Sequence, residues 1–271
     1  MSGKNLRLKK LFKGKKNLVI SAIDHVMFYG DQVGIEDARA AIENCITVDA
    51  LILPRFMLER NWDLFGGTNS PIPIVRINWA FIYSLKRFSF SFATAIVTTV
   101  KEAVASGAEA VICSLFLEEH ENQKMEAENI AIFSEVVRQK EALGIPLIGE
   151  CYVVEHKDKT ADEVHLKVKR ISRIMAELGA DSIKTFYTGN KFHQVVENTP
   201  VPIFTIGAEK LNTDLQVLQK AYDSISQGAR GIIFGRNIFM AKDPIKIVKA
   251  LNKVINEGVS PEEVVEEYNL E

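Results

Sequence analysis

One lysine lies in a segment that has the character of a buried strand. Lys184 belongs to the run Ser182–Tyr187, whose β-branched and aromatic residues are typical of a strand. A buried ammonium without a partner costs several kcal/mol, so we expect Lys184 to lose its proton and act as an amine nucleophile towards a carbonyl. The alternative is a lysine that extends from the rim of the strand to solvent.

Polar side chains also follow other predicted strands. The residues at these strand ends are Asp24, His25, Arg55, Arg76, Asn78, Glu150, Tyr152 and Lys184. Strand faces alternate, so Tyr152 shares a face with Glu150, and Asp24 with Ala22. An acid, a phenol and an amine could therefore meet in one pocket. Each also has a structural interpretation: Asp24 could cap a loop, and Arg76 could form an ion pair with Glu150.

Two glycine turns near the C-terminus predict an anion site. The runs TIGAEK and FGRNIF follow the last two predicted strands and contain Gly207 and Gly235. Barrel enzymes commonly bind phosphate at this place, through backbone N–H groups and the start of a short helix. Arg236 and Lys210 would add positive charge. The alternative is two ordinary turns.

The order of elements predicts an α/β fold, a (β/α)8 TIM barrel. The candidate strands are Asn17–Asp24, Ala50–Arg55, Ile72–Asn78, Glu109–Phe116, Pro146–Val153, Ser182–Tyr187, Pro202–Gly207 and Gly231–Arg236. The candidate helices are Glu36–Ile46, Pro54–Asn61, Phe92–Ser106, Asn122–Leu143, Ala161–Leu178, Lys191–Glu197, Asn212–Ser226 and Pro244–Glu257. This repeated βα unit favours the barrel. A doubly wound open sheet is the alternative, but no GxGxxG follows the first strand.

Both ends of the chain are expected to add a short helix. The basic segment Lys4–Lys16 predicts an amphipathic helix that caps the barrel, in preference to one that binds an anionic surface. Its apolar positions are Leu6, Leu8, Leu11 and Phe12. The segment Ser260–Glu271 opens with SPEE, a helix start. No linker rich in proline or serine divides the chain, so we expect one domain over residues 1–271.

Composition excludes several classes of protein. A net charge of -2 over 271 residues argues against nucleic-acid binding. No apolar run reaches membrane-spanning length, and no signal peptide follows Met1. Cys45, Cys113 and Cys151 are odd in number and lie in apolar segments, which indicates reduced thiols and a cytoplasmic location. The five histidines lack metal-binding spacing, so no metal is expected.

Three motifs carry a resemblance that extends over nearly the whole chain. They are IDH at 23–25, GADSIKTFYTGN at 179–190 and GARGIIFGRNIF at 228–239. The chain resembles the archaeal-type class I fructose-bisphosphate aldolases of the DeoC/LacD-like aldolase family. Relatives in this family include ADH (2-amino-3,7-dideoxy-threo-hept-6-ulosonate) synthase and the autoinducer-2 phosphate thiolase. The resemblance implies a lyase that uses a covalent lysine without a cofactor, and a homo-oligomer.

The resemblance also implies roles for particular residues. Lys184 would form a Schiff base with a ketone, Tyr152 would be the general acid/base, and Asp24 would assist proton transfer and bind substrate. The residues expected to bind the substrate or its phosphate are His25, Arg76, Gly207, Ala208, Lys210, Gly235 and Arg236.

Three departures from the family pattern affect the substrate-facing loops. Val26 replaces the glycine of the usual DHG, Glu150 stands where an aromatic residue is common, and Ala208 replaces the second of two glycines. The resemblance implies an aldolase that cleaves or forms a carbon–carbon bond in a phosphorylated ketose. The alternatives are an ADH synthase-like transaldolase, a CoA-dependent acyltransferase acting on a phosphorylated diketone, and a barrel that binds sugar phosphate without turnover.

Overall fold

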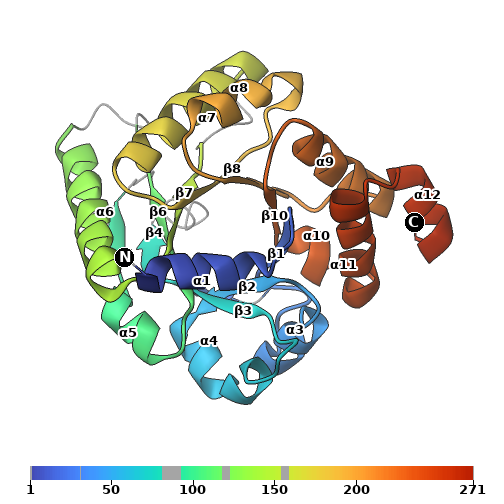
Figure 1. Ribbon diagram of the computed structural model, residues 1–271, viewed down its shortest axis with the longest axis horizontal. Helices are drawn as coiled ribbons and strands as arrows, with labels where there is room; N and C mark the ends of the chain where they lie inside the picture. Colours follow the sequence, from blue (N-terminus) through green and yellow to red (C-terminus); the bar gives the residue numbers. More distant parts are fainter. Residues whose placement is uncertain (1, 31, 81–92, 118–122, 154–158, 271) are drawn as a thin grey trace.

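The computed structural model describes residues 2–30, 32–80, 93–117, 123–153 and 159–270. There, eight parallel strands close into a barrel in the order β1-β10-β9-β8-β7-β6-β3-β2 (Figure 1). They are β1 (Leu18–Ala22), β2 (Ala50–Pro54), β3 (Ile72–Arg76), β6 (Ala110–Leu115), β7 (Leu147–Cys151), β8 (Ser182–Thr185), β9 (Ile203–Ile206) and β10 (Gly231–Phe234). The predicted strands are confirmed, and the closed ring excludes the open doubly wound sheet.

Helices surround the barrel (Figure 1). They are α3 (Ala38–Asn44), α4 (Arg55–Arg60), α5 (Val100–Ala105), α6 (Gln123–Leu143), α7 (Ala161–Glu177), α8 (His193–Asn198), α9 (Asp214–Ser226), α11 (Pro244–Asn252), its π-helical continuation η5 (Lys253–Glu257) and α12 (Pro261–Tyr268). Capping boxes at Thr99, Thr160 and Thr213 begin α5, α7 and α9. These reciprocal side-chain bonds satisfy N–H groups that a helix start leaves unpaired. Among the described helices, none combines the length and the apolar composition that a membrane span requires.

The predicted helix Phe92–Ser106 is wrong in its first half. Phe92, the first residue of this predicted helix, lies outside the described part of the chain. So does Asn122, the first residue of the predicted helix Asn122–Leu143. Strand β5 (Thr94–Ile96) instead pairs antiparallel with β4 (Asn78–Ala80). The β-branched residues of this segment favour an extended backbone, and the helix begins only after the cap at Thr99.

Apolar side chains form two layers, one inside the barrel and one between the barrel and the helices. Ile20 and Phe204 belong to the inner layer, whereas Val19 and Ile183 belong to the outer layer. This alternation follows from the period of two along a strand. Because Ile183 faces the helices, Lys184 faces the barrel interior.

The N-terminal helix α1 (Ser2–Phe12) closes the amino end of the barrel. The Phe12 ring stacks with Phe204, with 6.3 Å between ring centroids, and Leu11 is buried. Leu6 is 66% exposed. The predicted apolar face of this capping helix is therefore confirmed only in its last turn.

Candidate active site

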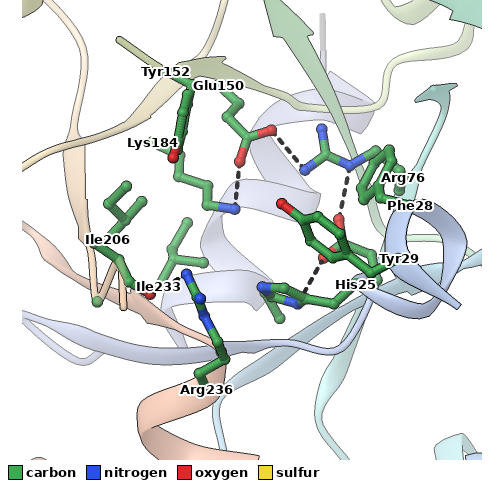
Figure 2. A pocket seen from close by; sticks show the side chains of 15 residues that line it. His25, Phe28, Tyr29, Arg76, Glu150, Tyr152, Lys184, Ile206, Ile233 and Arg236 are labelled. Carbon is green, nitrogen blue, oxygen red and sulfur yellow. Dashed lines mark hydrogen bonds and ion pairs between the residues drawn. The ribbon is translucent and has the colours of Figure 1, made fainter. Parts of the chain in front are cut away.

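A pocket opens at the carboxyl ends of the barrel strands, where parallel barrels place their active sites (Figure 2). Its lining residues are Ala22, Asp24, His25, Phe28, Tyr29, Arg76, Glu150, Tyr152, Lys184, Ile206, Gly207, Ala208, Ile233, Gly235 and Arg236. All the predicted site residues except Lys210 are among them. Within the described residues, no group of three or more His, Cys, Asp or Glu side chains could hold a metal ion.

Lys184 is buried in this pocket but does not lack a partner. Its Nζ lies 2.5 Å from Glu150 Oε1. The two residues are aligned on neighbouring strands, β8 and β7, so their side chains leave the sheet side by side. The expectation that burial alone would deprotonate Lys184 therefore needs correction, because the amine faces a carboxylate and not an apolar wall.

The Glu150 carboxylate also joins Lys184 to a second ion pair. Arg76 Nη2 lies 2.7 Å from Glu150 Oε2, and Arg76 Nε donates to Asp24 Oδ2 at 2.8 Å. Ser114 Oγ donates to Glu150 Oε2 at 2.5 Å and accepts from Arg76 Nη1 at 2.8 Å. Asp24, Arg76, Glu150 and Lys184 thus form a chain of alternating charge, which we call the charge chain.

The charge chain determines the ionisation of Glu150. Burial alone would raise the pKa of this carboxyl, but the charges of Arg76 and Lys184 and the hydrogen bonds from Lys184 and Ser114 hold it well below its usual range. In the resting protein Glu150 is therefore ionised beside Lys184. Arg76 is 2% exposed and bonded along the floor of the pocket, as the ion-pair interpretation predicts.

Tyr152 and His25 both stay uncharged at neutral pH. Burial raises the pKa of the Tyr152 phenol to about 12, with a smaller contribution from nearby Tyr29. Burial lowers the pKa of His25 to about 4, although the carboxylate of Asp24, 3.8 Å away, acts in the opposite direction. At neutral pH the pocket thus contains a phenol that can donate a proton and a neutral imidazole.

The sequence reasoning missed two aromatic residues of the pocket wall and one serine bonded to the charge chain. Phe28 and Tyr29 lie on the short helix α2 (Val26–Tyr29), which begins directly after His25. The Arg76 guanidinium lies 5.7 Å from the centre of the Phe28 ring, and burial raises the pKa of Tyr29. The helical spacing of His25, Phe28 and Tyr29 is the signal that could have revealed this face. The third missed residue, Ser114, had no such signal.

The other end of the pocket is built by the two glycine turns. Arg236 extends from the start of α10 (Arg236–Phe239) into the pocket beside Ile233 (Figure 2). Its Nη2 donates to Ala208 O at 2.8 Å. Glycine is needed at position 235, because a Cβ there would lie 2.6 Å from His25 Cε1. This end therefore combines a guanidinium with turns that let the backbone come close to a ligand.

Lys210 is not brought into the pocket. Ala208 has a φ of 58°, in the left-handed region, and this turn redirects the chain. Asn237 then holds the following residues: its Nδ2 donates to Glu209 O at 3.0 Å, and its Oδ1 accepts the Leu211 N–H at 2.8 Å. The residues after Ala208 are thereby tied to α10, so Lys210 lies off the pocket wall.

Comparisons with known proteins agree with this architecture. The sequence model of a family described as DeoC/LacD family aldolase matches residues 78–241. An uncharacterized aldolase of Saccharolobus solfataricus is 34% identical over 264 residues, covering 95% of this chain and 96% of the relative. A 3-hydroxy-5-phosphonooxypentane-2,4-dione thiolase of Yersinia pestis is 31% identical over 259 residues, covering 94% of this chain and 83% of the relative.

Solved structures share the same fold. A Schiff base-forming fructose-1,6-bisphosphate aldolase superposes with a TM-score of 0.78 at 22% identity, covering 93% of this chain and 99% of the other. An archaeal fructose 1,6-bisphosphate aldolase gives a TM-score of 0.77 at 22% identity, covering 94% and 100%. At this level of identity the likeness supports the barrel fold alone.

Proposed function

The chain belongs to the DeoC/LacD family of aldolases, and on this basis we propose that it is a class I aldolase whose Schiff-base lysine is Lys184. The observation that carries the proposal is the position of its Nζ, 2.5 Å from Glu150 Oε1 in a pocket at the carboxyl end of the barrel. The substrate we propose is a phosphorylated ketose. Fructose 1,6-bisphosphate is one candidate within this class.

The first step is attack of Lys184 Nζ on the ketone carbon. A C–N bond forms, the carbonyl oxygen leaves as water, and an iminium remains. Glu150 Oε1 is placed to take protons from the Lys184 ammonium and pass them to the departing oxygen, so that both protons of the water come from the ammonium and Glu150 ends as a carboxylate. The iminium nitrogen is positive like an ammonium, so the charge chain remains neutral as a whole and Glu150 keeps a cationic partner.

The second step is movement of the carbon–carbon bond electrons to the iminium nitrogen, which gives an enamine. In the cleavage direction the substrate hydroxyl gives its proton to the Asp24 carboxylate, and the enamine carbon takes one from the Tyr152 phenol, which the proton held by Asp24 then restores. Water finally adds to the product iminium, which releases the ketone and returns Lys184. Tyr152, held as a neutral phenol by its raised pKa, is the proposed donor in this exchange. A positioned acid or base of this kind contributes about 10²–10⁴-fold in rate. We assign Asp24 to orienting the substrate hydroxyl.

The phosphate would bind at the end of the pocket opposite the charge chain. Arg236 would offer a charged guanidinium there, and the turns at Gly207 and Gly235, which line the pocket, would offer backbone N–H groups. Binding energy from this remote group would orient the ketone towards Lys184. His25, uncharged between the two ends, is proposed to contact the substrate.

A second candidate function has its own support in the comparisons. The thiolase of Yersinia pestis covers 94% of this chain at 31% identity. In this alternative the protein uses Lys184 on a phosphorylated diketone and passes an acyl group to the thiol of coenzyme A. Product formation that requires coenzyme A would favour this reaction, whereas cleavage to an aldehyde without coenzyme A would favour the aldolase.

Borohydride trapping tests the shared lysine and the substrate class together. The protein is incubated with a panel of phosphorylated ketones and diketones, reduced with borohydride and measured by intact mass and peptide mapping. We expect an irreversible adduct on Lys184 in the wild type and none in Lys184→Met. The variant Lys249→Met, which changes an exposed lysine of α11, is the matched control. An adduct on another lysine, or turnover by Lys184→Met, would contradict the proposal.

A further inference from the structure

A half-buried lysine lies behind the anion end of the pocket. Lys220, on α9, donates from Nζ to Gly207 O at 3.0 Å. No carboxylate of the described residues lies within ion-pair distance of Lys220, unlike Lys184. Burial lowers the pKa of its amine to about 8. An ammonium in such a place is costly unless an anion is near, so its presence calls for a functional reason.

The hydrogen bond from Lys220 sets the orientation of one peptide group. Gly207 O accepts from Lys220 Nζ and also from Asn237 Nδ2 at 3.3 Å. In a trans peptide the C=O and the N–H point in opposite directions. Drawing the Gly207 carbonyl towards α9, on the outer side of the barrel, therefore turns the Ala208 N–H towards the pocket side.

The Ala208 N–H is available to a ligand. It meets no acceptor within the described residues, although Ala208 itself lines the pocket. The left-handed φ of 58° at Ala208 is unfavourable for a residue with a Cβ. Two donors on the Gly207 carbonyl explain how this conformation is held.

We propose that Lys220 is a positioning residue for phosphate: it fixes the Gly207–Ala208 peptide with its N–H towards the pocket and adds a positive charge behind that peptide. The polarised N–H and the ammonium then attract the same anion, together with Arg236. The inference rests on the phosphate subsite of the proposed function. It adds a residue outside the pocket wall that determines how strongly this subsite binds a phosphate monoester.

Protonation of Lys220 and anion binding must then strengthen each other. Coupling between two sites is reciprocal, so an anion that prefers charged Lys220 binds less tightly as the pH rises through the pKa of about 8. His25 at about 4 and Tyr152 at about 12 titrate well outside this range. An anion whose own charge is constant will therefore report the state of the lysine.

Other charged groups surround α9 without pairing with Lys220. Asp223 on the same helix accepts from Gln219. Strand β10, packed beneath α9, carries no titratable side chain. The helical segments α11, η5 and α12 also pack against α9. They carry Lys246 and Lys249, Lys253 and Glu257, and the four glutamates of α12 with Tyr268. Arg236 and Glu209 lie on the turns of the pocket.

Sulfate binding tests the inference directly, because sulfate remains a dianion across the range used. Its dissociation constant is measured by titration calorimetry between pH 6.5 and 9.5 for the wild type, Lys220→Met, Lys220→Arg and the exposed control Lys249→Met. At pH 7 we expect Lys220→Met to bind sulfate about tenfold more weakly than the wild type. Lys220→Arg should bind within about twofold of the wild type and lose the pH dependence, because its guanidinium stays charged.

Turnover supplies a readout that a purely structural residue would not move. Lys220→Met should raise KM for a phosphorylated ketone with kcat nearly unchanged, and leave an unphosphorylated analogue unaffected. Equal sulfate affinity in the wild type and Lys220→Met would overturn the inference, as would a pH dependence that persists in Lys220→Arg. Absence of sulfate binding to the wild type would instead overturn the phosphate subsite on which it rests.

Discussion

The two ends of the pocket manage charge in opposite ways. At the amine end, Lys184 and Arg76 alternate with Glu150 and Asp24, so positive and negative charges balance. At the anion end, Arg236 and Lys220 donate to backbone carbonyls, and no carboxylate of the described residues neutralises them. The balanced end is suited to the proposed reaction, in which one cation, the Lys184 ammonium, is replaced by another, the iminium. The unbalanced end is suited to an anion such as the phosphate of the proposed substrate.

Removing the carboxylate of Glu150, which lies at the centre of the charge chain, should destabilise the protein. Glu150→Gln leaves Lys184 without its carboxylate and removes one of the two carboxylates that pair with Arg76, so we expect the free energy of unfolding to fall by about 3–5 kcal/mol. Chemical denaturation measures this change. The double variant Glu150→Gln/Lys184→Met should lose less than the sum of the single variants, since the pair is removed together. Strict additivity would show that the ion pair is not a stabilising unit.

Removing the Tyr152 hydroxyl should affect the chemistry at the balanced end and leave anion binding at the other end unchanged. We expect Tyr152→Phe to lower kcat by about 10³-fold, because proton transfer loses its positioned donor. Sulfate affinity at the other end should remain unchanged. The comparison variant is Tyr29→Phe, whose hydroxyl also reaches the pocket. A larger loss of kcat in Tyr29→Phe would reassign the proton donor to α2.

His25, which lies between the two ends of the pocket, should make the free energy of unfolding depend on pH. Unfolded His25 takes up a proton below its ordinary pKa of 6.5, whereas folded His25 does so only near pH 4. The unfolded state therefore binds more protons in this window, and the free energy of unfolding falls as the pH drops from 6.5 to 4, by about 3 kcal/mol in total. Urea denaturation at several pH values measures the slope. His25→Gln should be less pH-dependent, and an unchanged slope would contradict this origin.

The smallest effect is expected at the turn of the unbalanced end. Ala208→Gly relieves a left-handed residue with a φ of 58°, so we expect a gain of up to about 1 kcal/mol in the free energy of unfolding, reduced by the greater freedom of unfolded glycine. Thermal denaturation measures it. Activity should not fall, since the backbone keeps its course. Destabilisation would indicate that the methyl group packs usefully against the barrel.

Alternation along single strands made much of the site predictable. Composition located β8 and predicted that Lys184 is buried, and the period of two grouped Tyr152 with Glu150 on one face of its strand. The pairing with Glu150 was out of reach, because it depends on the register between two strands that are joined by a long helix. The same holds for Ser114 on β6. The sequence could predict that Lys184 is buried, but it could not predict that Glu150 lies beside the amine as its ion-pair partner.

Two further errors have local causes. Lys210 was expected in the pocket because it follows the glycine turn, but the backbone reverses at Ala208, and Asn237 ties the next residues to α10. Tyr29 was passed over because the helix that carries it, α2, is only four residues long. The single-domain organisation and the homo-oligomer stay predictions.

The ring stack between Phe12 and Phe204 has a consequence for the chemistry above it. Phe204 is the residue aligned with Lys184 on the neighbouring strand, and its ring is completely buried. The first helix of the chain thus closes the barrel beneath the Lys184 side chain. Loosening this helix would open the amino end of the barrel to water beneath Phe204 and the Lys184 side chain.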